Sequence, residues 1–134
     1  MTTGPDTGAY EETYLTLFGH VPDAVRDRWT FSAEHGRFTA PGLLEELRRE
    51  VITRSPLGLK VQQLVQFAQL VALGRADAAR HHALGAVRAG AGERDLLAVA
   101  ETTLITSGVP GYSLALALAR EALATTDQHP EKES

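Results

Sequence analysis

The chain has 134 residues, no cysteine and a formal net charge of −4, from 13 basic and 17 acidic residues. This length fits one domain that buries roughly 65–70% of the surface exposed by the unfolded chain. The missing cysteines exclude disulfides, thiolate metal sites and thiol-based peroxide reduction. The charge balance gives no basic surface for nucleic acid or for an anionic membrane.

The sequence is also the kind expected of a cytoplasmic protein. Its start, MTTGPDTGAYEET, has neither the basic segment nor the apolar segment of a secretion signal. No apolar stretch approaches the ~20 residues that a membrane-spanning helix needs, because Gln, Thr, Arg or Glu interrupts the longest ones. We therefore expect no membrane partner.

The first part of the chain predicts two helices after a disordered start. Residues 1–8 show no pattern of a buried face, so we expect them to be disordered. A helix over 10–18 is expected to end at Gly19. A second helix has Pro22 in its first turn and ends at Gly36.

A third helix, over 40–55, has two contrasting faces. Apolar residues recur at helical spacing on one face, and charged residues occupy the other. The apolar positions are Leu43, Leu44, Leu47 and Val51, and the charged positions are Glu45, Glu46, Arg48, Arg49 and Glu50. We expect the apolar face to be buried and the charged face to lie in water.

Four more helices are predicted in the second half of the chain. A nearly apolar helix over 57–74 is expected to be central, and a helix rich in alanine and glycine follows over 75–89. Two further helices cover 92–108 and 109–126, and Pro110 lies near the first turn of the second. No segment shows the alternation of a strand.

These elements predict an all-α, single-domain bundle of about six or seven helices joined by short turns. The helical domain is expected to cover 9–126. It lies between the disordered start over 1–8 and a flexible C-terminal tail over 127–134.

Two adjacent histidines, His81 and His82, lie in the alanine-rich helix. Histidine is the residue type that transfers protons near neutral pH. The alternative is a structural histidine, buried against a carbonyl or exposed to water. Neighbouring positions are about 100° apart around a helix, so the pair does not have the i, i+4 spacing of a helical metal site, and we expect no metal.

Glutamines are concentrated on the preceding, nearly apolar helix, at Gln62, Gln63, Gln66 and Gln69. Amides on such a helix are costly to bury unless they have hydrogen-bonding partners. They either form a network between helices or subunits, or they form a polar wall that binds the carbonyl or hydroxyl of a substrate. An amide wall favours a less charged ligand than a dicarboxylate.

Residues 57–123 resemble the carboxymuconolactone decarboxylase family, which includes the alkylhydroperoxidase D proteins. The matching segments are LGLKVQQLVQFAQLVALGR, HHALGAVRAGAGERDL and ITSGVPGYSLALALAREAL. The histidine that matches the family pattern is His82, eight residues before Gly90, and not His81. Residues 108–110 match the family's Gly-Val-Pro turn.

The resemblance implies an all-helical protomer that assembles into trimers or hexamers. It also implies one of two chemistries. One branch of the family reduces peroxides with a Cys-x-x-Cys pair, a glutamate and this histidine. The other decarboxylates a small lactone acid without a cofactor and uses the histidine to transfer a proton.

The sequence departs from both branches at the positions that would carry this chemistry. The two cysteine positions are occupied by Arg75 and Ala78, which excludes peroxide reduction. The family's glutamate is replaced by Gln63 and its neighbouring arginine by Gln62. The tyrosine before the Gly-Val-Pro turn is also missing, and Thr106 is the nearest polar residue.

We therefore expect a cofactor-independent lyase, isomerase or cyclase, acting on a small carbonyl, lactone or polyketide-like compound of secondary metabolism. Decarboxylation, ring rearrangement and cyclisation are the candidate reactions. His82 and Gln63 are the predicted catalytic residues, and the predicted substrate-binding residues are Gln62, Gln66, Arg75, Thr106 and Tyr112. The alternative is a non-catalytic relative that serves as an oligomeric ligand-binding protein or scaffold.

Overall fold

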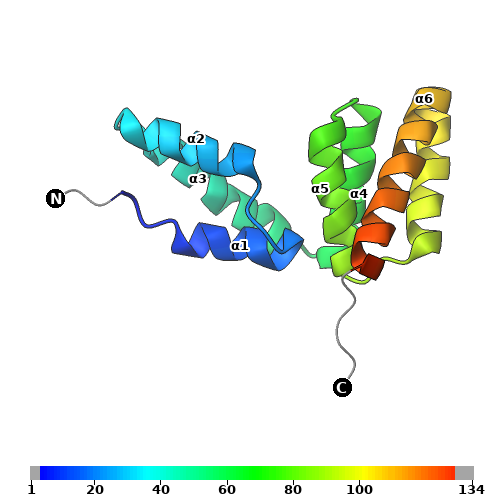
Figure 1. The fold of residues 1–134 in the computed structure, drawn as a ribbon, viewed down its shortest axis with the longest axis horizontal. Coiled ribbons are helices and arrows are strands. Elements are labelled where there is room, and N and C mark those ends of the chain that lie inside the picture. Colours follow the sequence, from blue (N-terminus) through cyan, green and yellow to red (C-terminus); the bar gives the residue numbers. More distant parts are fainter. Residues whose placement is uncertain (1–3, 129–134) are drawn as a thin grey trace, which may run out of the picture. The chain divides into compact units, whose positions relative to one another are not determined.

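The computed structural model describes residues 4–128, with side chains to Thr125, and these residues form helices and no strand (Figure 1). The elements are α1 (Gly8–Phe18), α2 (Asp23–Glu34), α3 (Thr39–Arg48), the π-helical turn η1 (Arg49–Thr53), α4 (Leu59–Ala72), α5 (Ala76–Arg88) and α6 (Glu93–Gln128). The predicted all-α class is confirmed. Contacts group the chain into two compact units, 1–56 and 57–134.

Glycines end the helices where the sequence predicts it. Gly19, Gly74 and Gly90 follow α1, α4 and α5, and each has a positive φ, of 79°, 76° and 109°. This conformation is strained for residues with a Cβ atom, which is why glycine is common at helix ends. The predicted boundaries of these three helices agree with the structure to within a few residues.

The last two predicted helices are the two halves of α6. Gly108 interrupts the helix with φ 79° and ψ −172°, and Pro110 follows in the first turn of the second half. Figure 1 shows the halves, coloured yellow and orange-red, side by side and antiparallel. The chain thus reverses at the predicted Gly-Val-Pro turn.

By length and composition alone, Glu93–Thr125 is apolar enough to cross a membrane. The sequence-based expectation that no such stretch exists is therefore wrong. The physical reason is that residues 102–119 carry no charge, and the Thr, Ser and Gly among them reduce the hydropathy only slightly. The reversal at Gly108 nevertheless divides the stretch into two antiparallel segments of a helical hairpin.

The second unit has a core made mainly of small side chains. Its buried members within α4, α5 and both halves of α6 are Phe67, Val71, Ala79, Ala83, Ala86, Leu96, Ala100, Ala115, Leu118, Ala119 and Ala122. Alanines at these positions allow the helix backbones to approach closely. The same side chains leave room for a larger residue on α5.

The backbone at Gly111, just after the reversal, lies close to side chains at the end of the first half of α6. A Cβ atom placed there would overlap the Ser107 hydroxyl and lie 3.0 Å from Cγ2 of Thr103. We expect Gly111→Ala to lower the free energy of unfolding by about 1–3 kcal/mol, because the Ser107 and Thr103 side chains must move away from the new Cβ atom. Gly92→Ala is the matched control, since no atom lies within 4 Å of its Cβ position. Equal thermal unfolding temperatures for the two variants would contradict this packing.

The first unit packs aromatic and aliphatic side chains of α1 and α2 against α3 and η1. Its core includes Tyr14, Leu17, Val25, Trp29 and Ile52. Tyr14 and Trp29 meet edge to face, with ring centroids 6.0 Å apart. This geometry is favourable for aromatic pairs.

The apolar face predicted for α3 is not the buried one. Leu43, Leu47 and Val51 are 65%, 58% and 52% exposed, and Leu44 is also exposed, whereas Glu45 is 1% exposed. The physical reason is that Glu45 has partners inside the unit, which removes the usual cost of burying a carboxylate. Helical periodicity identified the apolar positions correctly but assigned them to the interior, whereas the buried position is Glu45 and the neighbouring Glu46 and Glu50 stay exposed.

Two smaller expectations are also corrected. Val61 and Val65, on the nearly apolar α4, are exposed, while Gln62 and Gln63 on the same helix are buried. The helix α6 also includes residues 127 and 128, which the sequence assigned to the flexible tail. Residues 1–3 and 129–134 lie outside the described part of the chain.

Candidate functional site

The α5 helix places His82 among small side chains. Ala79 and Ala86 lie one turn before and one turn after it, and both are fully buried. His82 itself is 8% exposed. The alanines therefore create the space in which the imidazole ring is held inside the second unit.

The α4 helix supplies the hydrogen-bonding partner of this ring. Nδ1 of His82 lies 2.8 Å from Oε1 of Gln63, which is fully buried. Nε2 of Gln63 donates in turn to Oε1 of Gln66 at 3.0 Å. The two predicted catalytic residues and Gln66 thus form one hydrogen-bonded chain.

The direction of this chain determines the tautomer of the neutral imidazole. Because Gln63 presents its oxygen to His82, Nδ1 must carry the hydrogen and donate it. The lone pair of the neutral ring is then on Nε2. In the same orientation, Nε2 of Gln63 donates to Oε1 of Gln66.

Gln62 is the second buried amide at this end of α4. It is 9% exposed, and its side chain makes no hydrogen bond to the described part of the chain. It is about 100° around the helix from Gln63. Its amide has one acceptor and two donor hydrogens for a bound molecule.

The other predicted substrate-binding residues lie outside this hydrogen-bonded chain. Arg75 is exposed and lies at the N-terminal end of α5, seven residues or about 10 Å along the helix axis from His82. Thr106 is exposed near the Gly108 turn, and Tyr112 packs against the core of the second unit. Their roles stay predictions.

The adjacent His81 has a different environment from His82. It is half-buried, and its Nδ1 lies 3.0 Å from the backbone carbonyl oxygen of Asp77, one turn earlier on α5. Among residues 4–128, no group of three His, Cys, Asp or Glu side chains is placed to hold a metal ion.

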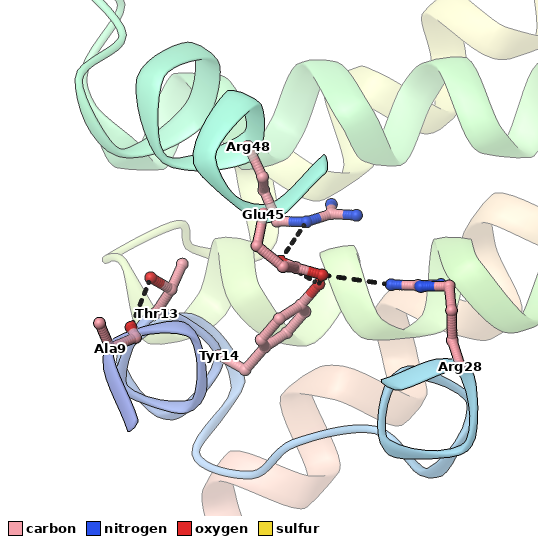
Figure 2. A network of polar contacts seen from close by, with 6 residues as sticks. All are labelled: Ala9, Thr13, Tyr14, Arg28, Glu45 and Arg48. Carbon is pink, nitrogen blue, oxygen red and sulfur yellow. Dashed lines mark hydrogen bonds and ion pairs between the residues drawn. The ribbon is translucent and has the colours of Figure 1, made fainter. Parts of the chain in front are cut away.

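Sequence reasoning missed a buried polar cluster in the first unit, which Figure 2 shows around Glu45. The Tyr14 hydroxyl lies 2.9 Å from both carboxylate oxygens of Glu45. Arg48 donates to Oε1 at 3.2 Å, and Arg28 lies 3.4 Å from Oε2. The only signal in the sequence is the three-residue spacing of Glu45 and Arg48, which is common on exposed helix faces.

Burial raises the pKa of Tyr14 to about 12. An unfolded tyrosine loses its proton near pH 10, so the folded chain holds this proton more tightly between pH 10 and 12. We expect a contribution of up to about 3 kcal/mol to stability, fully present below pH 10 and lost as the pH rises through 12. Alkaline titration followed by circular dichroism and tyrosinate absorbance measures this loss. An unchanged alkaline midpoint in Tyr14→Phe would contradict the assignment.

Two apolar grooves lie on the second unit. One, of about 400 Å3, lies between the two halves of α6, and the other, of about 240 Å3, lies between α4 and the first half of α6. Neither His82 nor Gln63 lines either groove. The buried hydrogen-bonded chain and the surface grooves are therefore separate features.

The sequence model of the carboxymuconolactone decarboxylase family matches residues 40–121, which is more than half of the chain. The matched region extends from α3 into the second half of α6 and includes Gln63 and His82. No curated protein and no solved structure matches the chain.

Proposed function

Because the chain belongs to the carboxymuconolactone decarboxylase family, we propose that it is a cofactor-independent enzyme in which His82 transfers a proton to or from a small carbonyl or lactone compound. Decarboxylation, ring rearrangement and cyclisation all need such a transfer next to a carbonyl group. A polyketide-like secondary metabolite in the cytoplasm is the substrate that we propose.

The observation that carries this proposal is the hydrogen bond between His82 and Gln63. A base must be held in one tautomer and one orientation to act efficiently. Gln63 fixes the tautomer and the orientation of the ring, because it accepts a hydrogen bond from Nδ1 and is itself held by Gln66. The base in this proposal is Nε2, and the proton that it takes returns to the product later in the cycle.

The amides also favour an uncharged group on the substrate. Gln63 is neutral, and so is the buried Gln62 beside it. An amide N–H binds a carbonyl or enolate oxygen, and it stabilises the negative charge that develops there during proton transfer. A substrate with two carboxylates would instead need cationic partners, and the one predicted, Arg75, is about two helical turns away.

An exchange experiment tests the proposal before the natural substrate is known. Neutral ketones and γ-lactones are incubated with the protein in deuterated water, and loss of the C–H signal next to the carbonyl is followed by proton NMR. We expect exchange above the buffer rate for at least one compound, and loss of that excess in His82→Ala. Exchange at the buffer rate throughout the panel would favour the non-catalytic alternative.

That alternative, an oligomeric scaffold or ligand-binding relative, is favoured by one observation. Gln63 and His82 are both buried, and the two described grooves lie elsewhere. In such a protein the amide–imidazole pair would stabilise the helix packing only. Gln63→Leu would then lower the thermal unfolding temperature without changing any exchange rate.

We also propose that the protein forms a homo-oligomer, a trimer or hexamer. The exposed apolar face of α3 and η1, formed by Leu43, Leu47 and Val51, supports this assembly. We expect Leu47→Glu to shift the mass measured by light scattering towards the protomer, because a charge in such a face opposes its burial. Leu73→Glu, at an exposed leucine after α4, is the control. A protomer mass for the unmodified chain would contradict the proposal.

A further inference from the structure

The groove of about 400 Å3 between the two halves of α6 has the composition of a ligand site. Leu96 and Ala119 are buried in its floor, and Leu97, Leu116 and Leu123 form its apolar sides. Its volume lies within the range of small-molecule pockets, about 300–1,000 Å3. Two charged side chains, Glu93 and Arg120, complete its lining.

Arg120 is a cation without a partner in the described part of the chain. It makes no ion pair or hydrogen bond there. The positions three and four residues away on the helix are all alanine or leucine, so no i, i+3 or i, i+4 pair is available to it. The adjacent Glu121 is already bound to Arg80, at 2.7 Å.

Glu93, the other charged residue of the groove, has a different electrostatic environment. It lies in the first turn of α6, where the helix dipole places partial positive charge. That charge partly balances the Glu93 carboxylate. Arg120, exposed in the middle of the second half of α6, has no such compensation, and its guanidinium is the group of the groove that can pair with an anion.

We propose that this groove binds a small molecule with an aliphatic chain and one carboxylate. The chain lies on Ala119 and between Leu116 and Leu123, and the carboxylate pairs with the guanidinium of Arg120. Burial of the CH2 groups on the leucines removes apolar surface from water and so stabilises the complex. This site is separate from His82 and does not depend on the proposed enzymatic function.

Calorimetric titration with octanoate and with octan-1-ol tests the assignment. We expect both to bind the unmodified chain, and Arg120→Gln to weaken octanoate by about 3- to 10-fold while leaving octan-1-ol unchanged. Arg94→Gln removes an equal charge from an exposed position on the same helix, outside the groove, and should leave both affinities unchanged. Ala124→Trp, at the exposed rim, should block both ligands without altering the core.

Three results would overturn the proposal. The first is the absence of octanoate binding to the unmodified chain. The second is an equal loss of octanoate affinity in Arg120→Gln and Arg94→Gln, which would indicate only a general charge effect. The third is a lower mass by light scattering for Ala124→Trp than for the unmodified chain, because a second copy of the chain would then occupy the groove.

Discussion

The variant His82→Ala is expected to lose about 100- to 10,000-fold in the rate of proton transfer to or from a carbonyl substrate, whereas His81→Ala keeps the rate of the unmodified chain. The difference follows from the environments of two adjacent residues. His82 is buried and held by Gln63 at 2.8 Å, while His81 is turned to another side of α5 and lies against the Asp77 carbonyl. Only His82 combines a titratable ring with a fixed orientation by a side chain.

The measurement is the deuterium exchange rate, or the rate of product formation once a substrate is identified. His82→Ala also leaves the buried Gln63 without this partner, which lowers the free energy of unfolding by about 1–3 kcal/mol. Thermal unfolding must therefore be measured in parallel, so that a folded but inactive variant is distinguished from an unfolded one. Equal rates for the two alanine variants would remove His82 from the mechanism.

Gln63 provides a second test of the same chemistry. In Gln63→Leu the imidazole remains but loses the acceptor for its Nδ1 hydrogen. We therefore expect a lower deuterium exchange rate, and we expect the dependence of that rate on pH to change as well. If Gln63 only stabilised the fold, Gln63→Leu would lower the unfolding temperature and would not change the dependence of the exchange rate on pH. Gln63 is thus a positioning residue that acts through His82.

The sequence predicted the local features of the fold better than the long-range ones. The helix ends at Gly19, Gly74 and Gly90 and the reversal at Gly108 were predictable, because a positive φ is a property of the residue itself and of its neighbours in the chain. The buried face of α3 was not predictable, because the partner that stabilises Glu45 in the interior is Tyr14, 31 residues earlier. The spacing of residues along one helix carries no information about a contact with a residue so far away in the sequence.

The candidate site shows the same division. Spacing to Gly90 and the family resemblance selected His82 and Gln63, and the structure joins them by a hydrogen bond. The hydrogen-bonded chain from His82 through Gln63 to Gln66 required the placement of these side chains in space. Arg75, Thr106 and Tyr112 were selected only by their places in the family pattern, and their roles depend on a bound substrate.

The largest effect on stability is expected at Glu45, a residue that the sequence assigned to water. Glu45→Ala should lower the free energy of unfolding of the first unit by about 3–5 kcal/mol, because it removes the anion between Arg28 and Arg48. Arg48 is itself mostly buried, and its guanidinium also lies over the Tyr14 ring, 5.5 Å from the centroid. The cation then stays in the interior without its carboxylate.

Chemical denaturation followed by Trp29 fluorescence measures this loss, because Trp29 is the single tryptophan and lies in the same unit. Glu50→Gln is the matched control. Glu50 also pairs with an arginine, at 2.9 Å, but both side chains are more than half exposed, and such pairs contribute about 0–1 kcal/mol. If Glu45→Ala were no less stable than Glu50→Gln, the buried cluster would not hold the first unit together. Its α3 and η1 segments would then be free to turn Leu43, Leu47 and Val51 inwards, as their spacing alone predicts.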